Sequence, residues 1–107
     1  MLAAAVKIKK TLKNLNVVQT QDASFSLELT HEDVRGAAWI KNGVEMLPSD
    51  KYEISMEGTV HTLTIRNCST NDESVYSFKL GKLSANARLN VEGTAIHLHL
   101  FMFDKNM

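Results

Sequence analysis

The chain has 107 residues, of which 44% are hydrophobic, and its twelve basic and twelve acidic residues cancel in charge. This length suffices for one domain with a single core, and the hydrophobic content is too high for a disordered chain. The balanced charge does not favour nucleic acid or an anionic membrane as a partner, and no apolar run reaches the roughly 18–20 residues of a membrane span.

The chain opens on a short apolar stretch at residues 1–6. Lys7, Lys9 and Lys10 follow this stretch rather than precede it, so we do not expect a signal peptide there. Beyond it, apolar and polar residues alternate with a period of two, which predicts β-strands. The predicted strands cover, in chain order, residues 6–8, 17–18, 23–30, 37–41, 44–46, 52–56, 59–65, 75–80 and 84–91. Short strands separated by turn residues, such as the pair Asn42–Gly43, predict a β-sandwich or a barrel.

Trp39, Tyr76 and Phe78 favour the sandwich. In antibody-like sandwiches a buried Trp on the third strand packs against a disulfide between the sheets, and a Tyr lies two residues before the second Cys. Here Tyr76 lies two residues before Phe78, and Leu27 stands where the first Cys would fall. We therefore expect this frame without its disulfide, with Leu27 and Phe78 filling the space by packing.

The single cysteine of the chain, Cys68, rules out a disulfide within it and suggests a reducing compartment. Burying a Leu or a Phe stabilises a fold by about 1.5–3 kcal/mol each, which can offset the roughly 2–4 kcal/mol of a disulfide. We expect Cys68 to be a small buried hydrophobe, because no basic or helix N-terminal setting activates its thiol. Residues 67–69 match the short N-glycosylation pattern, which matters only in a secreted protein.

No group of residues predicts a catalytic, cofactor-binding or metal-binding site. Asp72 and Tyr76 are interpreted as a structural corner, since no nucleophile or second carboxylate lies in register with them. His97 and His99 have a spacing that can hold a metal, but they lack a third and a fourth ligand, and His31 and His61 do not complete the set. The sequence therefore predicts a binding or structural module rather than an enzyme, with no cofactor and no small-molecule substrate.

Several stretches together resemble the titin-like intermediate-set immunoglobulin domains of giant muscle proteins. They are residues 6–15, 39–44, 51–55, 67–68 and 72–76. The resemblance implies an all-β fold, an antiparallel sandwich of two sheets without the intersheet disulfide, over residues 6–92. It also implies a structural, elastic module that bears load in the cytoplasm of striated muscle, in the I-band of the sarcomere. Its partners would be neighbouring immunoglobulin domains or other sarcomeric proteins.

The resemblance further implies that the segment around Val17 pairs in parallel with the last strand, around residues 87–91. Pulling on the two chain ends would then load the hydrogen bonds of this pair in shear. A second possibility stays open at this point, which is a recognition module of an adaptor or a cell-surface adhesion protein.

Residues 93–107 depart from the family. The stretch from Ile96 to Phe103 is apolar, β-prone and uncharged, where a further domain would be expected. We expect these residues to form a disordered or loosely docked tail. The alternative is an extra strand or a partner-binding segment.

Overall fold

The structure is a computed structural model that describes residues 5–93. The described residues form nine strands and one short 3-10 helix, which are β1 (Ile8–Lys10), β2 (Leu15–Val18), β3 (Ala23–Leu29), β4 (Ala38–Lys41), β5 (Val44–Glu45), β6 (Tyr52–Glu57), β7 (Val60–Ile65), η1 (Thr70–Asp72), β8 (Ser74–Leu80) and β9 (Leu83–Glu92). None of the described residues belongs to a helix long and apolar enough to cross a membrane.

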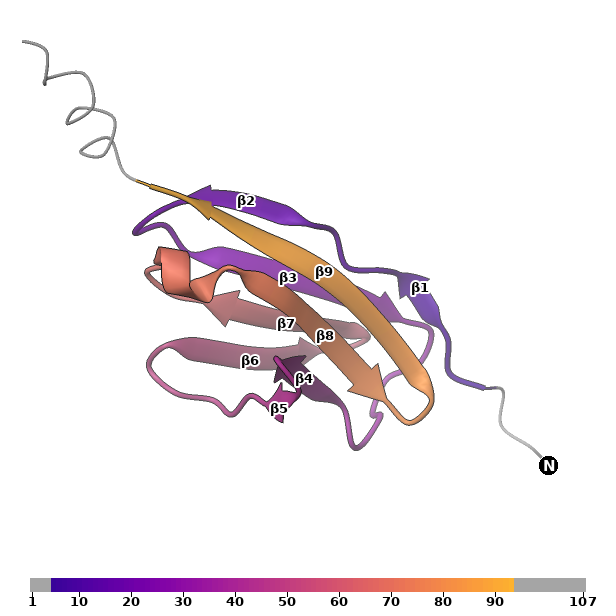
Figure 1. The fold of residues 1–107 in the computed structure, drawn as a ribbon. Coiled ribbons are helices and arrows are strands. Elements are labelled where there is room, and N and C mark those ends of the chain that lie inside the picture. Colours follow the sequence, from indigo (N-terminus) through magenta and orange to yellow (C-terminus); the bar gives the residue numbers. More distant parts are fainter. Residues whose placement is uncertain (1–4, 94–107) are drawn as a thin grey trace, which may run out of the picture.

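The strands form two sheets packed face to face (Figure 1). The first sheet has the order β1-β3-β7-β6, and the second has the order β2-β9-β8-β4-β5. β1 and β2 follow each other in the chain but lie at the edges of different sheets, so the connection between them crosses the side of the sandwich. The architecture is the immunoglobulin-like β-sandwich that the sequence predicts.

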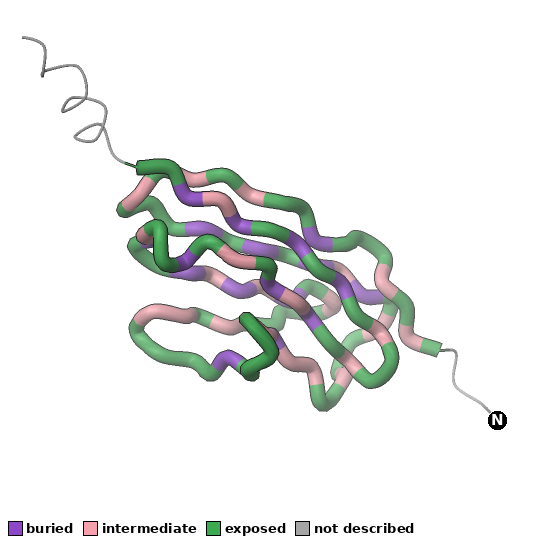
Figure 2. The backbone as a smooth tube through the Cα atoms, in the orientation of Figure 1, coloured by how far each residue is buried: buried purple, intermediate pink, exposed green. Residues whose placement is uncertain are grey.

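The core lies between the two inner faces. Along each central strand, buried and exposed residues alternate, as the purple and green segments show in Figure 2. This pattern follows from the pleat, which points successive side chains to opposite faces of a sheet. The buried apolar side chains are Leu12, Ala23, Phe25, Leu27, Leu29, Trp39, Met46, Leu63, Ile65, Cys68, Tyr76, Phe78, Ala85, Ala87, Leu89 and Val91.

Phe78 occupies the centre of this core and is fully buried. Its ring lies 5.3 Å from the Trp39 ring, edge to face, and 5.1 Å from the His61 ring between ring centroids. Leu27 is also buried and pairs in register with His61. Cys68 is a free, buried thiol, so the sandwich is held without an intersheet disulfide, as predicted. Direct contact between Leu27 and Phe78 stays a prediction.

Several element boundaries differ from the sequence predictions. β1 covers Ile8–Lys10 rather than residues 6–8, and β2 begins at Leu15 rather than at Val17. Both limits depend on the partner strand, because Lys10 pairs with Glu28 and Leu15 pairs with Leu89. Only the alternation inside a strand is visible in the sequence. The predicted polar connection before β8 contains η1, whose presence depends on a local cap described below.

Candidate load-bearing site

β2 and β9 form the only parallel pair among the described strands. Their register joins Leu15 to Leu89, Asn16 to Asn90, Val17 to Val91 and Val18 to Glu92. Hydrogen bonds continue past both ends of the pair. The Arg88 N–H donates to Asn14 Oδ1 at 2.8 Å before it, and the Gln19 N–H donates to the Glu92 carbonyl at 2.8 Å after it. The predicted parallel pairing around Val17 is confirmed.

The backbone groups of β2 alternate in direction. In a parallel ladder the N–H groups of every second residue point to the partner strand. Because the Gln19 N–H points to Glu92, the same repeat directs the Val17 N–H to the Asn90 carbonyl. The Val18 N–H points away from β9 and donates to Gln21 Oε1 at 2.9 Å. Val17 is therefore the residue in the middle of β2 whose N–H belongs to this ladder.

Amide side chains reinforce the pair on its solvent face. Asn90 Nδ2 donates to Asn16 Oδ1 at 2.9 Å, and Arg88 Nε donates to Asn90 Oδ1 at 2.9 Å. On the other side of β9, the Val91 N–H donates to Glu73 Oε2 at 3.0 Å, just before β8 begins. These contacts tie the end of β9 to both neighbouring segments.

The ends of the described chain lie at opposite ends of the sandwich (Figure 1). β2 and β9 run in the same direction, so a pull on the two ends draws β2 toward one end of the sandwich and β9 toward the other. This force acts along the strands and across their hydrogen bonds. The bonds are thus loaded together in shear rather than opened one after another.

A second attachment precedes β2 in the chain. β1 pairs with β3 at Ile8 and Lys10, and the Thr30 N–H donates to the Lys7 carbonyl at 2.9 Å. The Lys7 N–H donates in turn to Thr30 Oγ1 at 2.9 Å. A force applied at the N-terminal end therefore acts on β1 in the first sheet before it acts on β2 in the second sheet.

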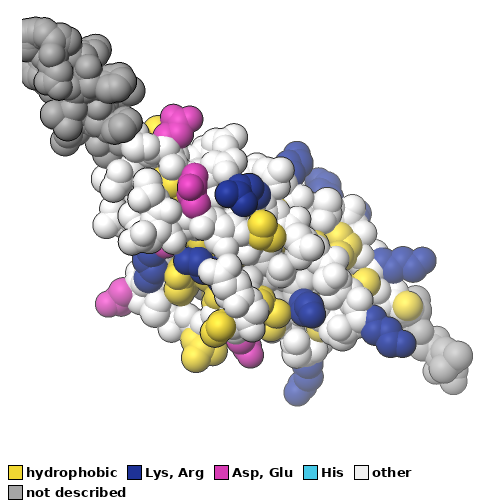
Figure 3. All heavy atoms as spheres, viewed as in Figure 1, with side chains coloured by type: hydrophobic (Ala, Val, Ile, Leu, Met, Phe, Trp, Pro, Cys, Tyr) yellow, Lys and Arg dark blue, Asp and Glu magenta, His cyan; other side chains and the backbone are white. Residues whose placement is uncertain are grey.

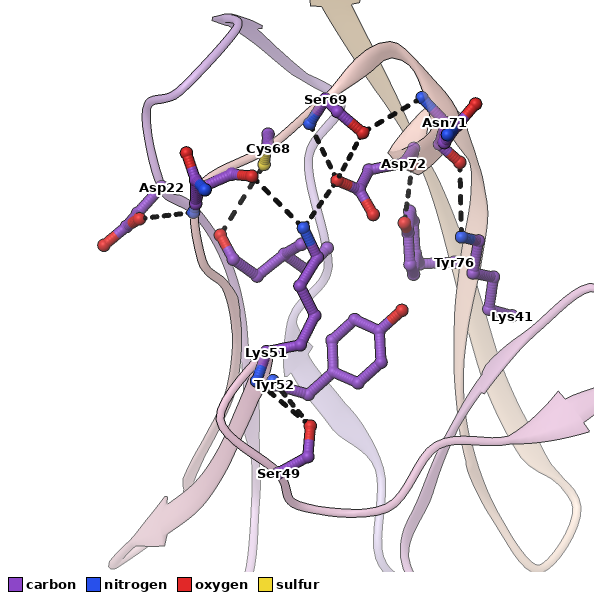
Figure 4. Close-up of polar contacts among 12 residues, drawn as sticks. Asp22, Lys41, Ser49, Lys51, Tyr52, Cys68, Ser69, Asn71, Asp72 and Tyr76 are labelled. Carbon is purple, nitrogen blue, oxygen red and sulfur yellow. Dashed lines mark hydrogen bonds and ion pairs between the residues drawn. The ribbon is translucent and has the colours of Figure 1, made fainter.

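A polar corner closes the end of the sandwich from which β8 starts (Figure 4). The Tyr76 hydroxyl donates to the Asp72 carbonyl at 2.6 Å. Asp72 Oδ2 accepts from Lys51 Nζ at 2.8 Å and from the Ser69 N–H at 2.8 Å. Ser69 caps η1 and forms a capping box with Asp72, which stabilises this short turn. The structural corner predicted from Asp72 and Tyr76 is confirmed, whereas Lys51 was not predicted to take part.

Opposing effects act on the Asp72 carboxyl, which is 5% exposed. Burial alone would raise its pKa, but the hydrogen bonds from Lys51 and Ser69 and the charge of Lys51 hold the pKa below its usual value. A carboxyl with a lowered pKa stabilises the fold above its unfolded pKa of about 4, and this contribution disappears as the pH falls below that value. Burial raises the pKa of Tyr76, so its hydroxyl remains a donor.

We expect Tyr76→Phe to lower the free energy of unfolding by about 1–3 kcal/mol, because the buried Asp72 carbonyl loses its donor. Urea unfolding followed by Trp39 fluorescence measures this change. Tyr52→Phe is the matched control, since no hydrogen bond joins the Tyr52 hydroxyl to the residues around it in Figure 4. The control should change stability by less than about 0.5 kcal/mol. Equal effects of the two substitutions would contradict this account of the corner.

Cys68 lies inside the same corner and is 1% exposed. Its Sγ lies 3.6 Å from the Ile65 carbonyl, to which the thiol donates. Burial raises the pKa of the Cys68 thiol, and the charge of Asp72 raises it further. The thiol therefore stays protonated at neutral pH and is a poor nucleophile. The prediction of a small buried hydrophobe at this position is confirmed.

His61 is a buried residue whose role the sequence analysis missed. It lies on the inner face of β7 together with Leu63 and Ile65, and it is 4% exposed. Its Nε2 has no hydrogen-bond partner among the described residues. Burial lowers the pKa of His61, because the charged ring loses its hydration. The alternation of residues along β7 is a signal that His61 points inward, but the sequence analysis considers His61 only as a possible metal ligand.

We expect the free energy of unfolding to fall as the pH drops below about 6.5. His61 then becomes protonated in the unfolded chain, whereas the buried ring in the folded chain stays neutral because its pKa is lowered. The loss approaches about 1.4 kcal/mol per pH unit between the unfolded and the folded pKa of His61. Urea unfolding between pH 8 and pH 5 measures it, a window in which Asp72 stays charged. His61→Phe should remove the slope, and His31→Phe, at the surface, should retain it. A slope that persists in His61→Phe would refute this origin.

Of the remaining histidines, only His31 lies within the described residues. His31 Nδ1 lies 2.7 Å from Thr30 Oγ1 at the surface. His97 and His99 lie outside the described residues. Within residues 5–93, no group of three or more His, Cys, Asp or Glu side chains is arranged to hold a metal ion.

The two packed sheets, the polar corner around Tyr76 and the contact between Trp39 and Phe78 in the core define an immunoglobulin-type sandwich. The chain belongs to the immunoglobulin I-set family, whose model, the Immunoglobulin I-set domain, matches residues 6–91. This family and fold are typically non-enzymatic.

The comparisons with known proteins identify muscle proteins as relatives. Domain I10 from titin is 41% identical, with a TM-score of 0.77 over 82% of this chain and 99% of that domain. Cardiac-type myosin-binding protein C from Gallus gallus is 36% identical over 73 residues, which are 68% of this chain and 6% of that protein. Fast-type myosin-binding protein C from Homo sapiens is 36% identical over 87 residues, 79% of this chain and 8% of that protein. The chain thus matches one domain within much longer curated relatives.

Proposed function

We propose that this chain is an elastic, load-bearing immunoglobulin module of a titin-like sarcomeric protein, formed by residues 6–92 and acting in the cytoplasm of striated muscle, in the I-band. It has no enzymatic activity in this proposal. The observation that carries it is the parallel β2–β9 pair, which joins the beginning of the domain to its end. Similarity to domains of titin and of myosin-binding protein C supports it.

The geometry explains how such a module bears load. The chain stays folded until the β2–β9 hydrogen bonds yield together, so the rate of unfolding under force determines how long it holds. After that event, residues 7–92 can extend to about 290 Å, at about 3.4 Å per residue. The folded module is therefore a stiff unit with a reserve of length.

The partners proposed for this module are neighbouring immunoglobulin domains or other sarcomeric proteins that tether both of its ends. The tether is essential, because a strand pair resists shear only when force reaches both strands. The tail expected at residues 93–107 lies outside the described residues from residue 94 onward. The proposal involves no nucleic acid, membrane or small-molecule substrate.

Single-molecule pulling in two directions tests the proposal. With handles at the two chain ends, we expect all-or-none unfolding and a length gain below about 290 Å, because the end-to-end distance of the folded domain is subtracted from the extended length. Moving the first handle to residue 20, as Thr20→Cys in a Cys68→Ala background, places it where β2 ends beside the end of β9. That geometry opens the pair one bond at a time, so the unfolding force should drop. Equal forces in the two geometries would refute load-bearing by this pair.

A further inference from the structure

β3 has an open edge where β1 leaves the first sheet. β1 pairs with β3 only at Glu28 and Leu29. Residues 11–14 then cross to the second sheet, and Leu12, which is 5% exposed, anchors this crossing in the core. β2 pairs with β9 instead of β3. The first five residues of β3, 23–27, therefore have β7 on one side and no described strand on the other.

The backbone of this edge has groups that point away from β7. The Leu29 N–H donates to the Thr59 carbonyl, so alternate residues of β3, Ala23, Phe25 and Leu27, also point their N–H and C=O groups to β7. The backbone groups of Ser24 and Ser26 then point to the open edge.

The serine side chains agree with this assignment. Ser24 Oγ lies 2.8 Å from Thr64 Oγ1, and Ser26 Oγ lies 3.2 Å from Thr62 Oγ1. Such close side chains are typical of antiparallel pairs that do not exchange backbone hydrogen bonds. The hydroxyl groups are thus occupied on the outer face, and the backbone groups at the edge are available.

A groove of about 410 Å³ lies along this edge. One wall runs from the end of β1 through the connection to the start of β2 and consists of Lys10, Thr11, Lys13 and Leu15. β3 residues 24–28 form the other side, next to Val60. The groove occupies the position that β1 would fill if it continued beside β3. Its shape therefore follows from the same crossing that leaves the β3 edge open.

The charged side chains that line the groove are Lys10, Lys13 and Glu28. Lys10 and Lys13 are exposed, and neither forms an ion pair with another described residue. Glu28 is already engaged, since its Oε2 lies 3.8 Å from Lys9 Nζ and accepts from Thr59 Oγ1 at 3.2 Å. Dark blue side chains are spread over the face drawn in Figure 3, and some of them lie on the right of the view, the side on which Figure 1 places β1.

We propose that the open edge of β3 binds an extended acidic peptide segment of a partner protein, which adds a strand beside Ser24 and Ser26 while Lys10 and Lys13 pair with its carboxylates. Strand addition uses main-chain hydrogen bonds for affinity and alternate side chains for specificity. Alternating acidic and apolar residues fit this groove, because the lysines border a wall that also carries Leu15. The site adjoins the β2–β9 pair at Leu15, which lines the groove and pairs with Leu89.

Nuclear magnetic resonance on the full chain tests this proposal. The probe is an acetylated, amidated peptide of alternating Glu and Val, about six residues long, the usual length of a strand. In the free chain, the Ser24 and Ser26 amides should exchange with solvent quickly, whereas Phe25 and Leu27 should be protected. At millimolar peptide, exchange at Ser24 and Ser26 should slow by at least about tenfold. A peptide with Lys in place of Glu should have no such effect.

Charge-reversal variants test whether Lys10 and Lys13 bind the acidic peptide. Lys10→Glu combined with Lys13→Glu should raise the Kd of the Glu–Val peptide by about tenfold or more, since two attractive rim contacts become repulsive. Lys79→Glu combined with Lys82→Glu makes the same change in net charge at the β8–β9 hairpin and should alter the Kd by less than about twofold. An equal loss in both double variants would show attraction to net charge alone and would overturn the proposal.

Three other outcomes of these experiments would also overturn the proposal of strand addition at the β3 edge. Ser24 and Ser26 amides already protected in the free chain would show that the edge is occupied by the chain itself. Binding of the Glu–Val peptide without protection of these amides would show that the contact is only ionic and that the peptide does not add a strand. With no binding, the lysines would act only to prevent edge-to-edge pairing, a common role of charged residues on exposed strands.

Discussion

Replacing Val17 with proline should raise the rate of unfolding about ten- to hundredfold and lower the force needed to unfold the chain by its ends. Proline has no N–H, so the Asn90 carbonyl loses its partner in the middle of the β2–β9 ladder. Leaving such a group without a donor costs about 1–3 kcal/mol. This cost falls mainly on the unfolding rate if the pair is the part of the fold that breaks first. Constant-force pulling and stopped-flow unfolding measure the two effects.

Asn16→Pro is the matched control for Val17→Pro. Asn16 lies next to Val17 on the same strand, but its N–H points away from β9. The control variant keeps the ladder intact and loses only the side-chain contact with Asn90. We expect it to retain most of the wild-type unfolding force. If the two proline variants unfold alike, or if Val17→Pro unfolds at the wild-type force, the load-bearing pair is assigned wrongly.

Replacing Phe78 with alanine should lower the free energy of unfolding by about 3–5 kcal/mol, a large part of the roughly 5–15 kcal/mol of a typical domain. Phe78 is fully buried between the Trp39 and His61 rings. The substitution leaves a cavity at the place where related sandwiches hold a disulfide, and no covalent bond restrains the two sheets there. A much lower urea midpoint at 25 °C, or the absence of a cooperative transition, is the expected result.

Val75→Ala is the control for Phe78→Ala on the same strand. Val75 is 45% exposed, and its side chain lies on the outer face of the second sheet. Its truncation should change stability by less than about 0.5 kcal/mol. Phe78→Leu keeps most of the apolar volume and should lie between the control and Phe78→Ala. A loss below about 1 kcal/mol in Phe78→Ala would contradict the view that packing replaces the disulfide.

The sequence was sufficient to predict the sandwich and its core because both depend on local alternation. Phe25, Leu27 and Leu29 could be assigned to one face from their spacing alone, and all three are buried. The parallel pairing of Val17 came from the family resemblance rather than from the residues. Alternation shows which face a side chain takes, but it does not show which strand lies alongside.

The polar corner and the buried histidine could be predicted only in part. The link between Tyr76 and Asp72 is local in the chain, so it could be anticipated. Lys51 comes from the connection before β6, and its contact with Asp72 depends on how the sheets pack. His61 lies on the otherwise apolar inner face of β7, a position that its residue type alone does not predict.

The open edge of β3 could not be predicted for a related reason. It exists because the chain leaves the first sheet after Lys10 and joins the second at Leu15. The sequence shows two short apolar segments there and no sign that they belong to different sheets. A groove that depends on the path of a connection becomes visible only when the strands have been placed in order.

The distance along the chain between β2 and β9 has a consequence for repeated stretching. Asn16 and Asn90 are in contact although 74 positions separate them in the chain. Closing so long a loop is entropically unfavourable, and folds dominated by distant pairings form slowly. After release, we expect the pair to re-form late, at a lower force than the one that broke it. Each cycle of stretch and release would then convert part of the work into heat, so the proposed elastic module would also act as a damper.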